Sequence, residues 1–219
     1  MFGGRVYNQN GQALLPASGQ CYVLWKTVSV GAGADAEHKV GLGIVRGSAP
    51  TPIIFVRSTQ WFGNWNGVER LSYGWLYTRT VPGQEYIIHS FDTRATAWVF
   101  MPADWVAARD PKQNWGVRFY GEDGKPTYVG TRKPLQIATL YKYPRLDPIP
   151  DVSLGSASLA ILIGPSGYHN TWQSNQYQYC VYRTLYNGRL KSYCDLIDSE
   201  GYPQSATDLP IPCIDTSLY

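Results

Sequence analysis

The sequence has no long hydrophobic run and little excess charge of either sign. Its 219 residues include no stretch near the roughly 18 to 20 consecutive apolar residues that a membrane-spanning helix needs. The opening residues, Met1 to Arg5, show no apolar core of signal-peptide length, so we expect a protein made in the cytoplasm. Lys and Arg total 19 against 16 Asp and Glu, which leaves a net charge of +3. This surplus is too small to indicate nucleic-acid binding, which usually shows as clustered basic stripes.

Patterns of metal-binding and disulfide-bonded proteins are missing as well. Zinc ligands come in closely spaced pairs, and disulfide frameworks belong to small proteins of oxidising compartments. Here the cysteines and histidines are scattered without such pairs: Cys21, Cys180, Cys194, Cys213, His38, His89 and His169. We therefore expect neither a metal nor another cofactor, and we interpret the cysteines as small buried apolar residues.

Aromatic residues are abundant, at 14% of the chain, and 22 Gly and 15 Pro separate short β-branched and aromatic runs. This is typical of a protein with many antiparallel strands. Only residues 102–109 have helix-forming content. We predict an all-β fold with little helix and the following strands: 5–8, 21–30, 40–45, 52–58, 69–80, 85–91, 96–101, 117–120, 135–141, 158–163, 176–186 and 189–197.

Three two-residue turns carry the clearest local signals, because positive φ at both central positions favours Gly, Asn and Asp. They are Asn10-Gly11, Asp123-Gly124 and Asn187-Gly188. Counting outward from the third turn pairs Tyr186 with Arg189 and Cys180 with Asp195. Because side chains alternate between faces along a strand, this register places Cys180 and Cys194 on opposite faces and argues against a disulfide between them.

The first two turns belong to a longer similarity between the two halves of the chain. Residues 6–12 match residues 119–125, and at the same offset of 113 residues Tyr22-Val23-Leu24 falls on Leu135-Gln136-Ile137. Self-similarity at a fixed period indicates a tandem duplication. We predict two tandem antiparallel β-sandwich-like domains, 1–112 and 113–219, with the polar segment 110–114 between them. A chance likeness between two hairpins is the other interpretation.

The repeated hairpin resembles one in a family of small tail-tip-associated proteins of tailed bacteriophages. The resemblance covers about residues 1 to 137 and includes the strand 52–57 and the aromatic strand Trp98-Val99-Phe100-Met101-Pro102. The two copies are Gly3-Gly4-Arg5-Val6-Tyr7-Asn8-Gln9-Asn10-Gly11 and Trp115-Gly116-Val117-Arg118-Phe119-Tyr120-Gly121-Glu122-Asp123-Gly124, the second completed by Arg132-Lys133-Pro134-Leu135-Gln136-Ile137. The loop at residues 31–38 differs from the family pattern.

The resemblance implies a structural virion protein of the tail tip or baseplate, located at the tail end of the particle. It implies assembly with other tail proteins, in several copies with three-fold or six-fold symmetry, and a role in anchoring or presenting a fibre. It transfers no catalytic residue, and we expect no enzymatic activity. The alternative function is a host-receptor or carbohydrate-binding module at the same tail end, which would contact a bacterial surface receptor.

Two aromatic groups set among Asn, Gln and Gly are the candidate contact residues. Rings with hydrogen-bonding neighbours suit a sugar or a partner's surface. The candidates are Trp61, Phe62, Trp65, Tyr168, Trp172 and Tyr177. A third row, Tyr73, Trp75 and Tyr77, alternates along a predicted strand and is interpreted as core.

Catalytic patterns are weak throughout the sequence. The segment Gly164-Pro165-Ser166-Gly167-Tyr168-His169 lacks the glycine spacing of a nucleophile elbow and no helix is expected after it. Carboxylate pairs that could cleave a glycoside, Glu69 with Asp92 or Asp195 with Asp198, have no supporting context. An enzyme that degrades envelope sugars is therefore the least favoured hypothesis.

Overall fold

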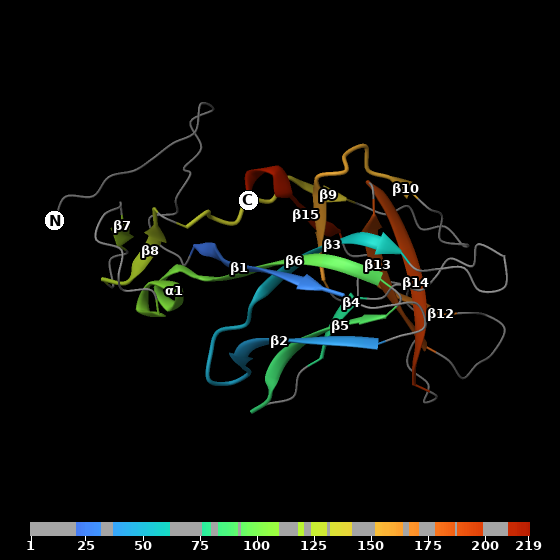
Figure 1. Cartoon of the computed structure of the whole chain (residues 1–219), viewed down its shortest axis with the longest axis horizontal. Helices are drawn as coiled ribbons and strands as arrows, with labels where there is room; N and C mark the ends of the chain where they lie inside the picture. The colour runs from blue at the N-terminus through green and yellow to red at the C-terminus, as the bar shows by residue number, and fades with distance from the viewer. Residues whose placement is uncertain are drawn as a thin grey trace.

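The chain forms antiparallel β-sheets with one short α-helix among the residues that the computed structural model describes (Figure 1). These are residues 21–31, 37–61, 76–79, 83–91, 93–109, 118–120, 124–130, 132–141, 152–163, 167–170, 178–186, 188–198 and 210–219. Their strands fall into a ten-stranded, a three-stranded and a two-stranded sheet, in which only β13 and β3 pair in parallel. The predicted all-β class with little helix is confirmed. Within these ranges no helix is long and apolar enough to cross a membrane.

Three strands build the centre of the large sheet: β1 (Tyr22–Val30), β6 (Thr93–Pro102) and β3 (Ile53–Trp61), with β6 between the other two. Side chains alternate along β6, so Trp98 and Phe100 share one face while Val99 and Met101 share the other. All four are buried. A strand covered on both faces explains why this part of the sequence is a nearly continuous apolar run.

Beyond β3 the sheet continues into the second half of the chain. β11 (Leu159–Leu162) pairs with β3, with Ile161 opposite Val56. β15 (Ile211–Asp215) follows β11, and β9 (Thr139–Tyr141) follows β15. The sequence did not predict β15, because Pro212 lacks an N–H and weakens the strand signal.

The extended segment 132–141 joins the two outer strands of this arrangement. Near its start, the N–H of Leu24 in β1 donates to Lys133 at 2.8 Å, and the N–H of Leu135 donates to Tyr22 at 2.7 Å. Near its end, the N–H of Ala138 donates to Cys213 in β15 at 2.8 Å. Backbone pairing therefore runs in a closed circuit through β1, β6, β3, β11, β15 and this segment, as in a small barrel.

A long hairpin pairs with the same edge of β3 as β11, two residues further along, where Tyr186 lies opposite Ser58. It consists of β13 (Gln178–Tyr186) and β14 (Arg189–Asp198), flanked by β12 (Gly167–Asn170) and β10 (Val152–Ser153). Its register pairs Tyr186 with Arg189 and Cys180 with Asp195, which confirms the prediction. Cys194 lies opposite Val181, so Cys180 and Cys194 belong to different faces of the hairpin.

The three-stranded sheet covers one face of the centre. It contains β2 (Glu37–Val45), β5 (Glu85–Phe91) and β4 (Leu76–Arg79), in the order β2, β5, β4. Leu42, Ile44 and Ile88 from this sheet are buried in one cluster with Val23 and Val99 from β1 and β6. Figure 1 shows β2 and β5 lying below β1 and β6. The two layers therefore share a core.

The helix and the small hairpin lie at the end of the molecule where β1 begins (Figure 1). α1 (Ala103–Arg109) matches the predicted 102–109 connector and buries Ala103, Val106 and Ala107. The hairpin of β7 (Arg118–Tyr120) and β8 (Pro126–Val129) contains Gly124, whose φ of 73° is the positive value that its predicted turn requires. The equivalent turn at Asn10-Gly11 lies outside the described residues.

Candidate functional site

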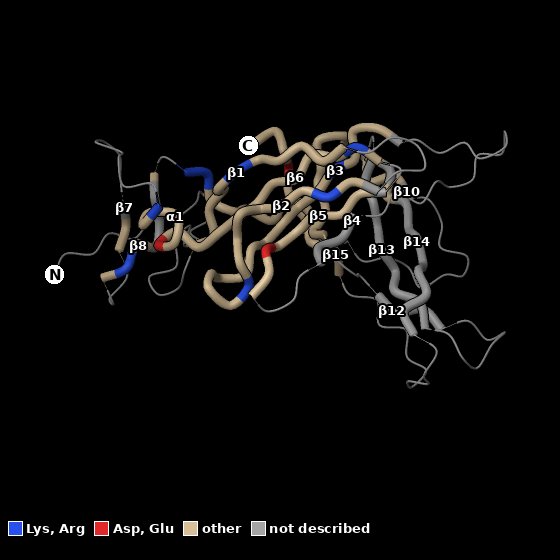
Figure 2. Tube along the Cα trace, turned by 60° about the horizontal axis from the view of Figure 1, so that its bottom comes forward, with Lys and Arg blue, Asp and Glu red and all other residues tan. Residues whose placement is uncertain are grey.

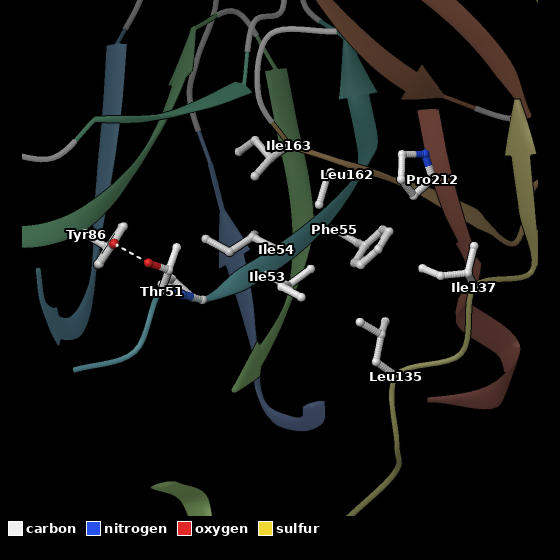
Figure 3. A pocket seen from close by; sticks show the side chains of 11 residues that line it. Thr51, Ile53, Ile54, Phe55, Tyr86, Leu135, Ile137, Leu162, Ile163 and Pro212 are labelled. Carbon is white, nitrogen blue, oxygen red and sulfur yellow. Dashed lines mark hydrogen bonds between the residues drawn. The ribbon is translucent and has the colours of Figure 1, made fainter. Parts of the chain in front are cut away.

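A cavity of about 560 Å³ lies beside the N-terminal end of β3 (Figure 3). This volume is in the range of sites that hold small ligands or the side chains of a partner. Its walls come from the start of β3 and the residues before it, the end of β11, β5, β15 and the segment 132–141. The lining residues are Thr51, Pro52, Ile53, Ile54, Phe55, Tyr86, Leu135, Ile137, Leu162, Ile163 and Pro212.

Strand pairing explains why these side chains meet. Leu162 lies opposite Phe55 in the pairing of β11 with β3, and the N–H of Ile163 donates to Ile54 at 2.8 Å. Beyond the end of β11 the cavity lies between β3 and the segment that contains Leu135 (Figure 3). The cavity is thus a consequence of a short β11 next to a longer β3.

The lining is apolar and carries no carboxylate, imidazole, thiol or amine. Its two hydroxyl groups belong to Thr51 and Tyr86, and they lie 3.4 Å apart with the Tyr86 hydroxyl donating. Among the described lining residues, these two hydroxyls are the only side-chain groups of a type used in acid–base or nucleophilic chemistry. The lining can instead remove apolar groups of another molecule from water.

Large apolar side chains are exposed around the mouth of the cavity. Leu140 is 60% exposed, Ile137 46% and Leu162 36%. Leu140 lies opposite Pro212 in the pairing of β9 with β15, so both point to the same side of the sheet. We call Ile137, Leu140 and Leu162 the apolar rim. Single exposed apolar residues are ordinary, but a group of them beside an apolar cavity is a candidate contact surface.

A second group of side chains lies at the α1 end of the molecule. The rings of Trp25 in β1 and Trp105 in α1 pack edge to face, with centroids 5.1 Å apart. Lys26 Nζ lies 4.4 Å from the centre of the Trp25 ring, and Arg109 Cζ lies 3.8 Å from that of Trp105. Arg132 Nη1 donates to the Trp25 carbonyl at 3.3 Å. With the adjacent Lys133, these residues form what we call the tryptophan cluster.

Two properties of the tryptophan cluster follow from partial burial. Burial lowers the pKa of Lys26, and the nearby Glu85 carboxylate acts in the opposite direction. The Lys26 ammonium donates to the Leu42 carbonyl at 2.7 Å. Among the described residues the buried Trp105 Nε1 has no hydrogen-bond partner, and its ring packs against Trp25 and Arg109.

The predicted contact residues are only partly placed by the structure. Trp61 is the last residue of β3 and pairs with Thr93, and Tyr168 lies in β12 opposite Cys180. Phe62, Trp65, Trp172 and Tyr177 lie outside the described residues, as do Tyr73 and Trp75 of the predicted core row. The contact role of the six candidates stays a prediction.

The weak catalytic candidates are also placed in part. Gly167 to His169 belong to β12, so a strand and not a helix follows the serine, as expected. Asp195 and Asp198 lie in β14, opposite Cys180 and Gln178. Glu69, Asp92 and Ser166 lie outside the described residues.

Sequence reasoning did not find the cavity or the tryptophan cluster. The cavity joins residues that are more than 150 positions apart, and its residues look like ordinary strand interiors. Trp25 and Trp105 each have a basic neighbour within four positions, in Lys26 and Arg109. That pairing is a local signal, but only the fold brings the two tryptophans together. Comparison of the chain with protein-family models, curated proteins and solved structures found no match to any of them.

Proposed function

We propose that the chain is a structural protein that works by docking other protein chains, without enzymatic activity. The observation that carries this proposal is the cavity with its apolar rim. Burying the rim residues against a partner would stabilise a complex by roughly 25 cal/mol for each Å² of apolar surface removed from water. The apolar lining of the cavity suits a bulky side chain from that partner as an anchor.

The proposed setting is the tail tip or baseplate of a bacteriophage, as the sequence resemblance implies. In that setting the chain assembles with other tail proteins in several copies, with three-fold or six-fold symmetry, and anchors or presents a fibre. A rigid β-rich body with an apolar docking surface supports such a role, because closed rings need the same contact repeated between copies. The setting rests on the hairpin resemblance and not on the cavity.

The division into two β-sandwich domains at residues 112 and 113 belongs to this proposal. Strand β3 pairs with β11, so strands from both sides of this boundary belong to one sheet. Separation there would leave open sheet edges on both parts. We therefore propose that the two units act as one body during assembly.

Mass spectrometry of purified particles of the phage that encodes the chain tests the proposed function. We expect the chain in stoichiometric amount. Ile137→Asp, which places a charge on the rim residue that also lines the cavity, should lower its incorporation into particles. Leu218→Asp is the matched control, because Leu218 is 49% exposed and lies outside the cavity lining. Absence of the chain from particles, or equal loss with both variants, would contradict docking through the rim.

The tryptophan cluster favours the alternative function, a receptor-binding module. Cations held against aromatic rings at a partly exposed end of the molecule are suited to binding a charged surface polymer. This function is compatible with the first, since the cluster and the cavity share no residue. Binding of the purified chain to envelope fragments of the host bacterium tests it.

A further inference from the structure

The tryptophan cluster contains four basic residues from three separate parts of the chain. Lys26 comes from β1, Arg109 from α1, and Arg132 and Lys133 from the segment that pairs with β1. The hydrogen bond from Leu24 to Lys133 fixes the last two beside the first. Figure 2 shows the basic positions gathering near α1 and β8. Long-range pairing therefore builds the positive charge of this end.

Positive charge exceeds negative charge there within the described part of the chain. Two carboxylates lie in the same surroundings, and each already accepts a backbone hydrogen bond. Asp104 accepts from the N–H of Trp105 at 2.7 Å, and Glu85 accepts from the N–H of Gly43. Four basic side chains and two carboxylates leave an excess of positive charge in the described part of this end, which favours an anion.

Arg109 is the side chain best arranged to bind such an anion. The Trp105 ring holds its guanidinium at 3.8 Å, and its Nη1 makes a long bond of 3.4 Å to the Trp105 carbonyl. A stacked guanidinium loses little further freedom on binding and presents its N–H groups as a planar fork, which matches carboxylate and phosphate oxygens. Arg109 is also exposed.

We propose that the tryptophan cluster binds an anionic polysaccharide through its carboxylate or phosphate groups. The inference rests on the receptor-binding alternative above and names its ligand. A polymer fits because the cations are spread over three chain segments, so several anionic groups can bind at once. Nucleic acid fits poorly, because the cations already occupy ring faces on which bases would stack.

Binding to defined polymers tests the proposal. The probes are two polysaccharides: polygalacturonate, which carries carboxylates, and phosphomannan, which carries phosphates. Neutral dextran, polyglutamate and duplex DNA are the comparisons. We expect binding to one or both of the first two at low salt, weakened by added salt because exposed charges are screened. The stronger of the two identifies the anionic group.

Charge-matched variants distinguish binding at the tryptophan cluster from a general effect of the protein's net charge. Arg109→Gln combined with Lys133→Gln should weaken binding about tenfold, since two charge-assisted contacts are lost. Lys39→Gln combined with Arg46→Gln removes the same charge from exposed positions of β2 and the residue after it, and should change binding less than about twofold. Arg109→Lys keeps the charge but loses the fork, so an intermediate loss is expected. Melting curves of all variants show whether each is folded.

Four results would overturn the proposal: no binding to either anionic polysaccharide, equal binding to dextran, equal or tighter binding to polyglutamate or DNA, or equal weakening by the site and control variants. Binding to host envelope fragments shows whether the ligand class or the receptor function is wrong. If fragments bind but the defined polymers do not, the ligand class is wrong and the receptor function stands. If neither binds, both are wrong, while docking through the apolar rim is unaffected.

Discussion

Leu135 donates its backbone N–H to the carbonyl of Tyr22 at 2.7 Å, and the two residues are 113 positions apart. That separation equals the offset of the predicted repeat, in which these two residues are equivalent. The neighbouring bridge between Val23 and Pro134 is antiparallel. Equivalent segments that pair antiparallel about equivalent residues are related by a local two-fold axis, as in an isologous interface. A duplicated strand that pairs with its copy would have this arrangement.

The shared sheet predicts that residues 1–112 do not fold alone. Without the second half, β3 loses β11 and β1 loses its pairing with residues 133–135, which leaves two open edges and an uncovered core. We expect no cooperative thermal transition and aggregation on size-exclusion chromatography. Coexpression with residues 113–219 should restore a soluble complex. A cooperative transition of 1–112 on its own would instead establish two independently folding domains.

Glu85 predicts the effect of a substitution in β2. A Cβ atom added at Gly41 would lie 2.6 Å from Glu85 Oε1, and the same carboxylate accepts the N–H of Gly43. The carboxylate can swing away, so the cost of Gly41→Ala is the loss of that hydrogen bond. We expect unfolding free energy to fall by about 1 to 2 kcal/mol in urea titrations.

A matched glycine and a double variant check this explanation. Gly31→Ala places its Cβ 3.9 Å from the nearest atom, in Arg94, and should change stability by less than about 0.5 kcal/mol. In Glu85→Ala the cost of Gly41→Ala should largely disappear, because the bond is already gone. Additive costs in the double variant would show that Glu85 is not involved.

Local chemistry accounts for what the sequence predicts well. The register from Tyr186 to Arg189 depends on one turn, and its Gly188 has the required positive φ of 71°. The pairing of β3 with β11 depends on residues about a hundred positions apart, for which a single sequence contains no signal. The cavity depends in turn on where β11 stops relative to β3. Packing decides which strands pair, so neither the pairing of β3 with β11 nor the cavity could be predicted from the sequence.

Cys213 predicts a loss of stability at alkaline pH. Burial raises the pKa of its thiol from 9.0 to about 11, because the thiolate is poorly solvated inside the protein. The unfolded chain therefore releases this proton at lower pH than the folded one. Its stabilising effect is full below about pH 9 and is lost as pH rises toward 11. Urea titrations at intervals across this range measure the decline.

Cys213→Ala should remove part of that decline, although it lowers stability at neutral pH by leaving a small cavity. Cys21→Ala is the control, because burial raises the pKa of Cys21 too, but that thiol is only partly buried. A decline with pH that is unchanged in Cys213→Ala would show that other groups, such as the tyrosines, cause it.

Tyr219 predicts how the closing segment of the circuit is held. Its hydroxyl donates to the Pro134 carbonyl at 3.0 Å and accepts the N–H of Gln136 at 2.9 Å. Its ring packs edge to face on Phe100, with centroids 5.2 Å apart. Tyr219→Phe keeps the ring and leaves two backbone groups without this partner, so we expect the free energy of unfolding to fall by about 1 to 2 kcal/mol in urea titrations.

Tyr22→Phe is the matched control for Tyr219→Phe. The Tyr22 hydroxyl makes one long bond of 3.4 Å to Thr51, and its loss should cost less than about 0.5 kcal/mol. Equal costs would mean that the Tyr219 ring, and not its hydroxyl, holds the segment in place.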